Sequence, residues 1–114
     1  MSGITTHVLD TSRGEPARGV PVTLEMLVAS GEWKLVGRGS TNADGRLKEL
    51  LPEGSDLVKG TYRLIFDTAT YYRKSKTEGF FPEVQILFEV RHPSRHHHVP
   101  LLLSPFGYST YRGT

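Results

Sequence analysis

Three consecutive histidines, 96 to 98, are the residues whose type and spacing in this sequence are best suited to proton transfer. Imidazole gains and loses a proton near neutral pH, so it can serve as an acid or as a base in water. Apolar residues follow at every second position: Val99, Leu101 and Leu103. This alternation predicts a strand that packs one face against a core, and it places His97 on that face.

The opposite face of the same predicted strand combines imidazoles with apolar groups: His96, His98, Pro100 and Leu102. In an ordinary antiparallel sheet the outward face meets water and is polar. Because Pro100 and Leu102 are apolar, we expect this second face to be covered as well. The simplest cover is another copy of the chain.

Other interpretations of the histidines are a tag, a metal site and a plain sheet edge. A tag lies at a terminus or in a linker, whereas this triplet runs directly into a predicted strand. A metal site is disfavoured because His97 and His98 point to opposite faces, cysteine is absent and no histidines have the helical i, i+4 spacing. Decoration of a sheet edge remains open on this stretch alone.

Two further candidates come from the first strand and from a central turn. In the strand, His7 shares a face with Thr5 and Leu9, opposite to Thr6 and Val8. The turn formed by residues 42–45 delivers Arg46 to the start of the next strand, with a glycine at 45 that is free to take a positive φ. Asn42 and Asp44 resemble part of a calcium loop, but the other ligand positions are missing.

The apolar residues alternate along almost the whole chain, which predicts short strands: 4–10, 20–28, 33–41, 47–51, 60–66, 84–90, the histidine strand and 106–112. One helix of one or two turns is expected from Ala69 to about Lys74, capped by Asp67 or Thr68. Eight short strands with regular turns predict an all-β sandwich of two antiparallel sheets.

Size and composition limit the classes of protein. A chain of 114 residues indicates one domain spanning 1–114, and the absence of cysteine excludes disulfides and thiol catalysis. The 14 basic and 12 acidic residues are interspersed, so no basic stripe for nucleic acid is present. No segment resembles an export signal or is long enough to cross a membrane. We therefore expect a cytoplasmic protein whose partners include neither nucleic acid nor membrane.

Three stretches carry a resemblance to a known family: T-H-V-L-D-T-S-R-G-E-P-A-R-G-V near the start, D-G-R in the centre and H-V-P-L-L-L-S-P-F-G-Y-S-T-Y-R-G-T at the end. Together they resemble the transthyretin-related family of 5-hydroxyisourate hydrolases along the entire chain. The enzymes carry a terminal Tyr-Arg-Gly-Ser that hormone-carrying transthyretins lack. Tyr111, Arg112 and Gly113 match it, and Thr114 replaces the serine.

The resemblance also implies which residues are catalytic. The two histidines and the arginine of the family fall on His7, His98 and Arg46, and His97 stands where the family commonly has tyrosine. Either histidine is suited to be the general base, with the other orienting water or substrate. Arg46 is suited to donate two parallel hydrogen bonds to a planar, oxygen-rich substrate. The tail from Tyr111 to Thr114 would bind substrate and close the pocket.

For the whole protein, the resemblance implies a transthyretin-like sandwich of two four-stranded antiparallel sheets with one short helix. It implies a homotetramer with sites in a channel between dimers, and no metal or organic cofactor. The implied reaction is hydrolysis of 5-hydroxyisourate to 2-oxo-4-hydroxy-4-carboxy-5-ureidoimidazoline in urate degradation, by histidine-assisted attack of water on a ring carbonyl.

Alternatives remain for the function and for each residue. A transthyretin-like carrier would use the same channel for an aromatic ligand, but the polar set at His7, Arg46 and His98 is unsuited to an apolar hormone. A non-catalytic sandwich for adhesion or assembly would leave this set without a reason. Taken singly, Arg46 suits a solvated turn, His7 a strand face and Tyr111 an interface. Jointly, with the resemblance, they favour an enzyme.

Overall fold

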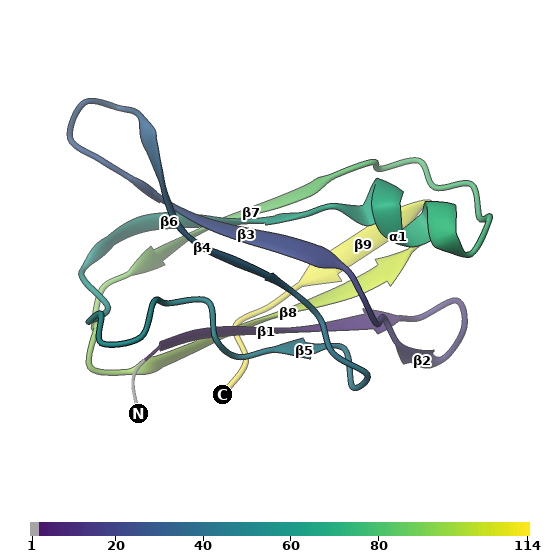
Figure 1. The fold of residues 1–114 in the computed structure, drawn as a ribbon, viewed down its shortest axis with the longest axis horizontal. Coiled ribbons are helices and arrows are strands. Elements are labelled where there is room, and N and C mark those ends of the chain that lie inside the picture. Colours follow the sequence, from purple (N-terminus) through teal and green to yellow (C-terminus); the bar gives the residue numbers. More distant parts are fainter. Residues whose placement is uncertain (1–2) are drawn as a thin grey trace.

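Two β-sheets face each other across an apolar core, with one short helix at one end of the molecule (Figure 1). The structure is a computed structural model and describes residues 3–114. Its elements in chain order are β1 (Gly3–Asp10), β2 (Glu15–Pro16), β3 (Pro21–Leu27), β4 (Trp33–Ser40), β5 (Arg46–Leu47), β6 (Gly60–Phe66), α1 (Thr68–Lys74), β7 (Val84–Val90), β8 (His96–Ser104) and β9 (Gly107–Thr110). The all-β sandwich with one short helix is thereby confirmed.

The first sheet departs from the expected four antiparallel strands. Its order is β2-β1-β8-β9, and β5 pairs with β1 as a fifth strand, whereas the second sheet has four strands in the order β4-β3-β6-β7. β1 and β8 are parallel. The expectation of two four-stranded antiparallel sheets is therefore correct for the second sheet and wrong for the first, because an alternating pattern identifies a strand but not the direction of its partner.

Alternation along the strands builds the core as the sequence predicts. On β1 the inward residues are Thr6, Val8 and Asp10, while Thr5, His7 and Leu9 are only partly buried. On β8 the inward side chains include His97, Val99 and the two leucines at 101 and 103. His97 is only 4% exposed, so its predicted position on the core face is confirmed.

Two predicted strands are shorter than expected. The strand predicted at 47–51 survives only as β5, Arg46–Leu47, and the strand predicted at 106–112 only as β9, Gly107–Thr110. Beyond β5 the chain crosses to the second sheet, where Leu50 is buried and its carbonyl lies against Gly37 of β4. A Cβ atom on Gly37 would lie 1.7 Å from the Leu50 oxygen. The apolar pattern at 47–51 therefore reflects burial without strand pairing.

The helix is capped as predicted and is tied to β1. The Asp67 carboxylate accepts a hydrogen bond from the Thr70 backbone N–H, which satisfies one of the free amides of the first turn. From the middle of α1 the Tyr71 hydroxyl donates to the buried Asp10 carboxylate at 2.7 Å. Within residues 3–114, no helix has the length and apolar character needed to cross a membrane.

Candidate functional site

The parallel pairing of β1 with β8 gathers the site histidines on one face of the first sheet. The register places Thr5 opposite His98 and His7 opposite Pro100. Because side chains alternate along both strands, Thr5, His7, His96 and His98 all lie on the outward face. The predicted common face of His7 and His98 thus arises from a strand pairing that joins the two ends of the chain.

A tight turn holds Arg46 beside this face. The Asn42 side-chain oxygen accepts hydrogen bonds from the backbone N–H groups of Asp44 at 2.9 Å and Arg46 at 3.0 Å. Gly45 has a φ of 75°, and a Cβ atom there would lie 2.4 Å from the Val8 oxygen. The positive φ expected at Gly45 is therefore confirmed, and glycine is required for close approach to β1.

The pairing of β5 with β1 completes this arrangement, because it sets Arg46 opposite His7. The Nε2 atom of His7 lies 2.9 Å from the Asp44 carbonyl oxygen. A carbonyl oxygen can only accept, so Nε2 of His7 carries the hydrogen and donates it. In the neutral ring, Nδ1 is then the nitrogen that remains free for another partner.

A pocket of about 300 Å³ opens over the paired strands β1 and β8. The residues that line it come from both ends of the chain and from the segment that begins at β5: Gly3, Thr5, Thr6, Arg46, Lys48, His96, His98 and Thr114. Three of the predicted site residues, Arg46, His98 and Thr114, thus line one pocket. His7 is not among these lining residues, but it pairs with Arg46 and is close enough to contribute to the lowered pKa of His98.

His98 is the half-buried imidazole of this pocket. Its Nδ1 atom lies 2.8 Å from the Thr5 hydroxyl oxygen. Burial lowers the pKa of His98, and the positive charges of Arg46, His7 and His96 lower it further. The ring of His98 is therefore neutral at neutral pH, which is the form that a general base requires.

The C-terminal tail is divided between this pocket and its surroundings. The Gly113 backbone N–H donates to the His98 carbonyl at 2.8 Å, and a Cβ atom at Gly113 would lie 2.6 Å from Cδ2 of the His98 ring. Gly113 therefore packs directly against His98, and Thr114 reaches the pocket.

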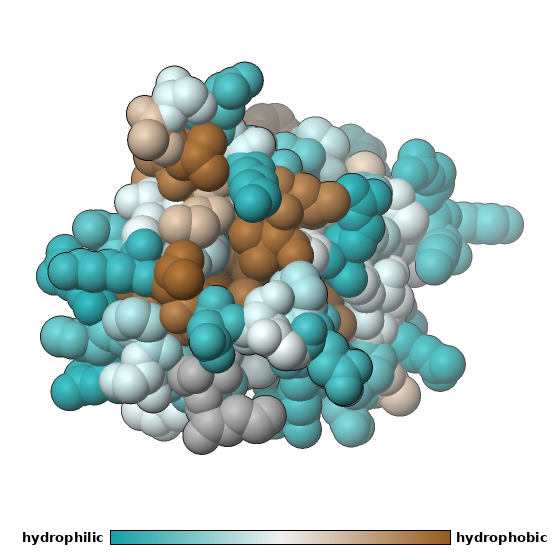
Figure 2. All heavy atoms as spheres, turned by 60° about the vertical axis from the view of Figure 1, so that its left-hand side comes forward, coloured by the Kyte–Doolittle hydropathy of each residue, from teal (hydrophilic) through white to brown (hydrophobic). Residues whose placement is uncertain are grey.

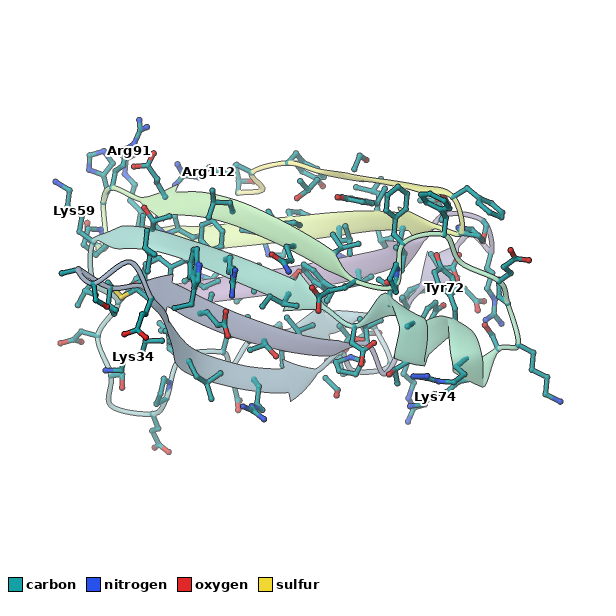
Figure 3. All side chains as sticks on the ribbon, turned by 90° about the horizontal axis from the view of Figure 1, so that it is seen from above. Lys34, Lys59, Tyr72, Lys74, Arg91 and Arg112 are labelled. Carbon is teal, nitrogen blue, oxygen red and sulfur yellow. The ribbon has the colours of Figure 1, made fainter. Side chains whose placement is uncertain are left out.

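Tyr111 and Arg112 do not line this pocket but border a second one. Tyr111 is 58% exposed, and the second pocket is lined by residues of β7, β8 and β9, His98 among them. Arg112 borders that pocket and also a third one, with Arg91 and His92 among its other lining residues, at the end of the molecule opposite α1 (Figure 3). The substrate-binding role expected for these two residues stays a prediction.

Sequence reasoning assigned no site role to five residues of the pocket: Gly3, Thr5, Thr6, Lys48 and His96. The alternation on β1 already places Thr5 on the face of His7, but a threonine alone gives no chemical signal. His96 gains a partner only through the parallel pairing, and Lys48 is ordinary at a strand end. Within residues 3–114, the histidine, aspartate and glutamate side chains form no group of three placed to hold a metal ion.

The comparisons with known proteins show the family of this chain. The model of the HIUase/Transthyretin family matches residues 4–113. This chain belongs to that family. A 5-hydroxyisourate hydrolase of Salmonella dublin is 45% identical over 111 residues, which cover 97% of this chain and 80% of the relative. The family resemblance inferred from the three sequence stretches is therefore confirmed.

Solved structures of both branches of the HIUase/Transthyretin family share the fold. The 5-hydroxyisourate hydrolase of Klebsiella pneumoniae has a TM-score of 0.86 and 36% identity, and each chain is covered in full. Sea bream transthyretin in complex with thyroxine has a TM-score of 0.89 and 32% identity, covering 97% of this chain and 94% of the transthyretin. Because a hydrolase and a thyroxine-bound transthyretin match about equally well, the fold alone does not separate the two functions.

Proposed function

We propose that this protein hydrolyses 5-hydroxyisourate to 2-oxo-4-hydroxy-4-carboxy-5-ureidoimidazoline. The observation that carries the proposal is the meeting of His98 and Arg46 in one pocket, with a lowered pKa at His98. A neutral imidazole next to a permanent cation is suited to activating water and to stabilising the negative charge that follows. The name of the Salmonella dublin relative, 5-hydroxyisourate hydrolase, supports the same reaction.

In the proposed reaction His98 is the general base. It takes a proton from a water molecule, whose oxygen attacks a ring carbonyl of the substrate. Arg46 donates hydrogen bonds to the oxygen that becomes negative in the tetrahedral intermediate. When the ring C–N bond breaks, the proton on His98 passes to the departing ring nitrogen, so His98 returns to its neutral form.

The other pocket residues have supporting roles in this proposal. His7 keeps Nδ1 free because Nε2 is committed to the Asp44 carbonyl, so it can orient the water or a substrate group. Lys48 adds a second positive charge to the lining of the pocket. Thr114 offers a hydroxyl, and Gly113 supports the ring of His98 from behind.

The carrier alternative is less well supported. A pocket for an apolar aromatic ligand is lined mainly by hydrophobic side chains, with few polar groups. The pocket over β1 and β8 is instead lined by two histidines, an arginine, a lysine and three threonines. Removing these groups from water to bind an apolar ligand would cost free energy without forming new hydrogen bonds.

The homotetramer is part of the proposal, and its support comes from a different surface than the one inferred from the sequence. Within a single copy Pro100 is already buried and Leu102 is half-buried, so the outward face of β8 needs less additional cover than the sequence implied. The exposed apolar residues lie elsewhere: Leu87 is 65% exposed on β7 and Tyr111 is 58% exposed after β9. Figure 2 shows further apolar side chains gathered at the surface of the end opposite α1.

Both β7 and β9 are edge strands of their sheets. Residues of both strands line the second pocket, so the two edges lie on the same side of the molecule. Their free N–H and C=O groups can pair with a second copy, which would also cover Leu87 and Tyr111. We therefore expect each single-domain copy to join others through this side. The cytoplasmic location expected from the sequence stays a prediction.

An absorbance assay tests the proposed activity. Urate oxidase converts urate to the unstable 5-hydroxyisourate, whose ultraviolet absorbance decays slowly without a catalyst. A catalytic amount of this protein should accelerate the decay, and the His98→Asn variant should not. An unchanged decay with folded wild-type protein, together with tight binding of an aromatic ligand, would instead favour the carrier.

A further inference from the structure

The hydroxyl of Thr5 connects two histidines of the pocket. Its oxygen lies 2.8 Å from Nε2 of His96 and 2.8 Å from Nδ1 of His98. The register of β1 against β8 explains this position, because Thr5 is opposite His98 while His96 is opposite Gly3, which has no side chain. The hydroxyl can therefore reach both rings from its place between them.

Counting hydrogens shows that the two rings cannot choose their tautomers independently. A hydroxyl has one hydrogen to donate and two lone pairs to accept, so it can donate to at most one of the two imidazoles, and at least one ring must donate to it. In one arrangement Nδ1–H of His98 donates to Thr5, and Thr5 donates to the bare Nε2 of His96. In the reverse arrangement Nε2–H of His96 donates to Thr5, and Thr5 donates to the bare Nδ1 of His98. In a third arrangement Nδ1–H of His98 and Nε2–H of His96 both donate to Thr5.

The first and third arrangements leave His98 with a free basic nitrogen, whereas the reverse arrangement does not. When Nδ1 of the neutral ring carries the hydrogen, Nε2 is bare and can take a proton from water. In the reverse arrangement Nε2 carries the hydrogen, so this nitrogen is a donor and cannot be a base. We infer that Thr5 is a positioning residue that holds His98 in its Nδ1–H tautomer, with His96 accepting the hydrogen of Thr5. This inference rests on the proposed function.

The charges that face His98 come from each element around it. Arg46 of β5 and Lys48 after it are cations, His7 comes from β1, and His96 from β8. Besides burial, Arg46, His7 and His96 lower the pKa of His98. The tail contributes Gly113 and Thr114, whose side chains do not titrate. These charges do not distinguish the two ring nitrogens of His98, whereas the Thr5 hydroxyl oxygen contacts Nδ1.

Thr5→Val tests the inference by kinetics. Valine keeps the β-branched shape, so the strand is retained while the hydroxyl is lost. We expect kcat to fall by about 10²-fold, within the range found when a catalytic histidine loses the group that sets its tautomer or its general-base function. Thr5→Ser retains the hydroxyl and should stay within about threefold of wild type. Thr23→Val, at a half-buried threonine of the second sheet, is the matched control and should not change kcat.

His96→Gln tests the acceptor of the Thr5 hydrogen. Glutamine keeps an acceptor oxygen for the Thr5 hydroxyl, so kcat/KM should stay within about tenfold of wild type. Full activity in Thr5→Val would overturn the inference.

Nitrogen NMR of the imidazole rings separates this inference from the proposed function, because it needs no substrate. The ligand-free wild-type protein should show His98 protonated at Nδ1 and bare at Nε2, and Thr5→Val should show a mixture. A wild-type His98 protonated at Nε2 would refute the inference even in an active enzyme. The expected tautomer in a protein without hydrolase activity would support the hydrogen-bond chain and refute the proposed function. If a variant fails to fold, the wild-type spectrum alone still tests the inferred tautomer of His98.

Discussion

At the scale of single residues, His98 and His7 have complementary environments. His98 has Nδ1 engaged with Thr5, and its pKa is lowered by burial. His7 has Nε2 engaged with a backbone carbonyl. Each ring therefore offers one particular nitrogen, and the two cannot substitute for each other in the proposed reaction.

We expect His98→Asn and His7→Asn each to lower kcat/KM by at least about 10²-fold, the lower range for loss of a proton-transfer group. Fold and assembly should stay intact, because both side chains lie on the outward face. Steady-state kinetics with His92→Asn, an exposed histidine outside this pocket, as the control would check this. A histidine whose variant retains the wild-type rate has no part in the mechanism.

His97 makes stability depend on pH. Burial lowers the pKa of this histidine below its value of about 6.5 in the unfolded chain. As pH falls below about 6.5, the unfolded chain binds a proton that the folded protein does not, so the free energy of unfolding decreases. His98 acts in the same direction, because its pKa is also lowered.

His97→Phe should remove the part of this acid sensitivity that belongs to His97. The drop in the urea midpoint between pH 7.5 and 5.5 should be smaller in the variant than in the wild type. Because phenylalanine does not titrate and suits a core position, the variant should fold normally. Equal drops in both proteins would show that His97 titrates alike in the folded and unfolded states.

At the scale of elements, α1 is attached to the first sheet through one tyrosine and not through its neighbour. Burial and the Asp10 carboxylate raise the pKa of Tyr71 to about 12, and its hydroxyl donates to that carboxylate. Tyr72 is also buried, but its hydroxyl has no hydrogen-bond partner within residues 3–114. The adjacent tyrosines thus offer a matched pair.

Tyr71→Phe should lower the free energy of unfolding by about 1–3 kcal/mol, because it leaves a buried carboxylate oxygen without its donor. Tyr72→Phe removes an unpaired hydroxyl and should be neutral or stabilising. Urea unfolding monitored by circular dichroism measures both. The expectation fails if Tyr72→Phe is the more destabilising of the two.

The tail after β9 is the element that tests the enzyme against the carrier. Deletion of residues 111–114 removes Gly113 from behind the His98 ring and Thr114 from the pocket. We expect kcat/KM to fall by more than about 10²-fold, because the base loses its support and the site opens to water. In contrast, Thr114→Ser keeps the hydroxyl and should change kcat/KM by less than about tenfold. A truncated protein with the full-length rate would remove the tail from the active site.

Alternation in the sequence identified most strands and which side of each faces the core, because burial on one side of a strand forces a period of two. It could not identify which strands pair with each other. Thr5 and His98 are hydrogen-bonded only because β1 runs parallel to β8, and no local sequence pattern encodes that pairing. The resemblance supplied His7, Arg46 and His98, whereas Thr5 and Lys48 became visible only in three dimensions. The segment at 47–51 was misassigned because Leu50 is buried without a strand partner.

At the scale of the whole molecule, assembly should depend on the side formed by β7 and β9. Light scattering at micromolar concentration should give a tetramer for the wild type. Leu87→Glu places a charge where a second copy would cover an apolar side chain, so it should give smaller species. Leu35→Glu, at an exposed leucine on the opposite edge strand β4, is the control and should remain tetrameric. A monomeric wild type would reject the assembly itself.

The pairing of β1 with β8 also governs when the pocket can exist. Thr5 and His96 are 91 positions apart, so their contact closes a very long loop. The chain must lose the conformational entropy of this loop before the contacts between β1 and β8 can stabilise it. During synthesis β1 can pair early with β2 and β5, but its other edge must wait for β8. That edge is meanwhile free to pair with other nascent chains. The pocket over β1 and β8 is therefore among the last features to form as the chain folds, and no partly synthesised chain lacking β8 can hold it.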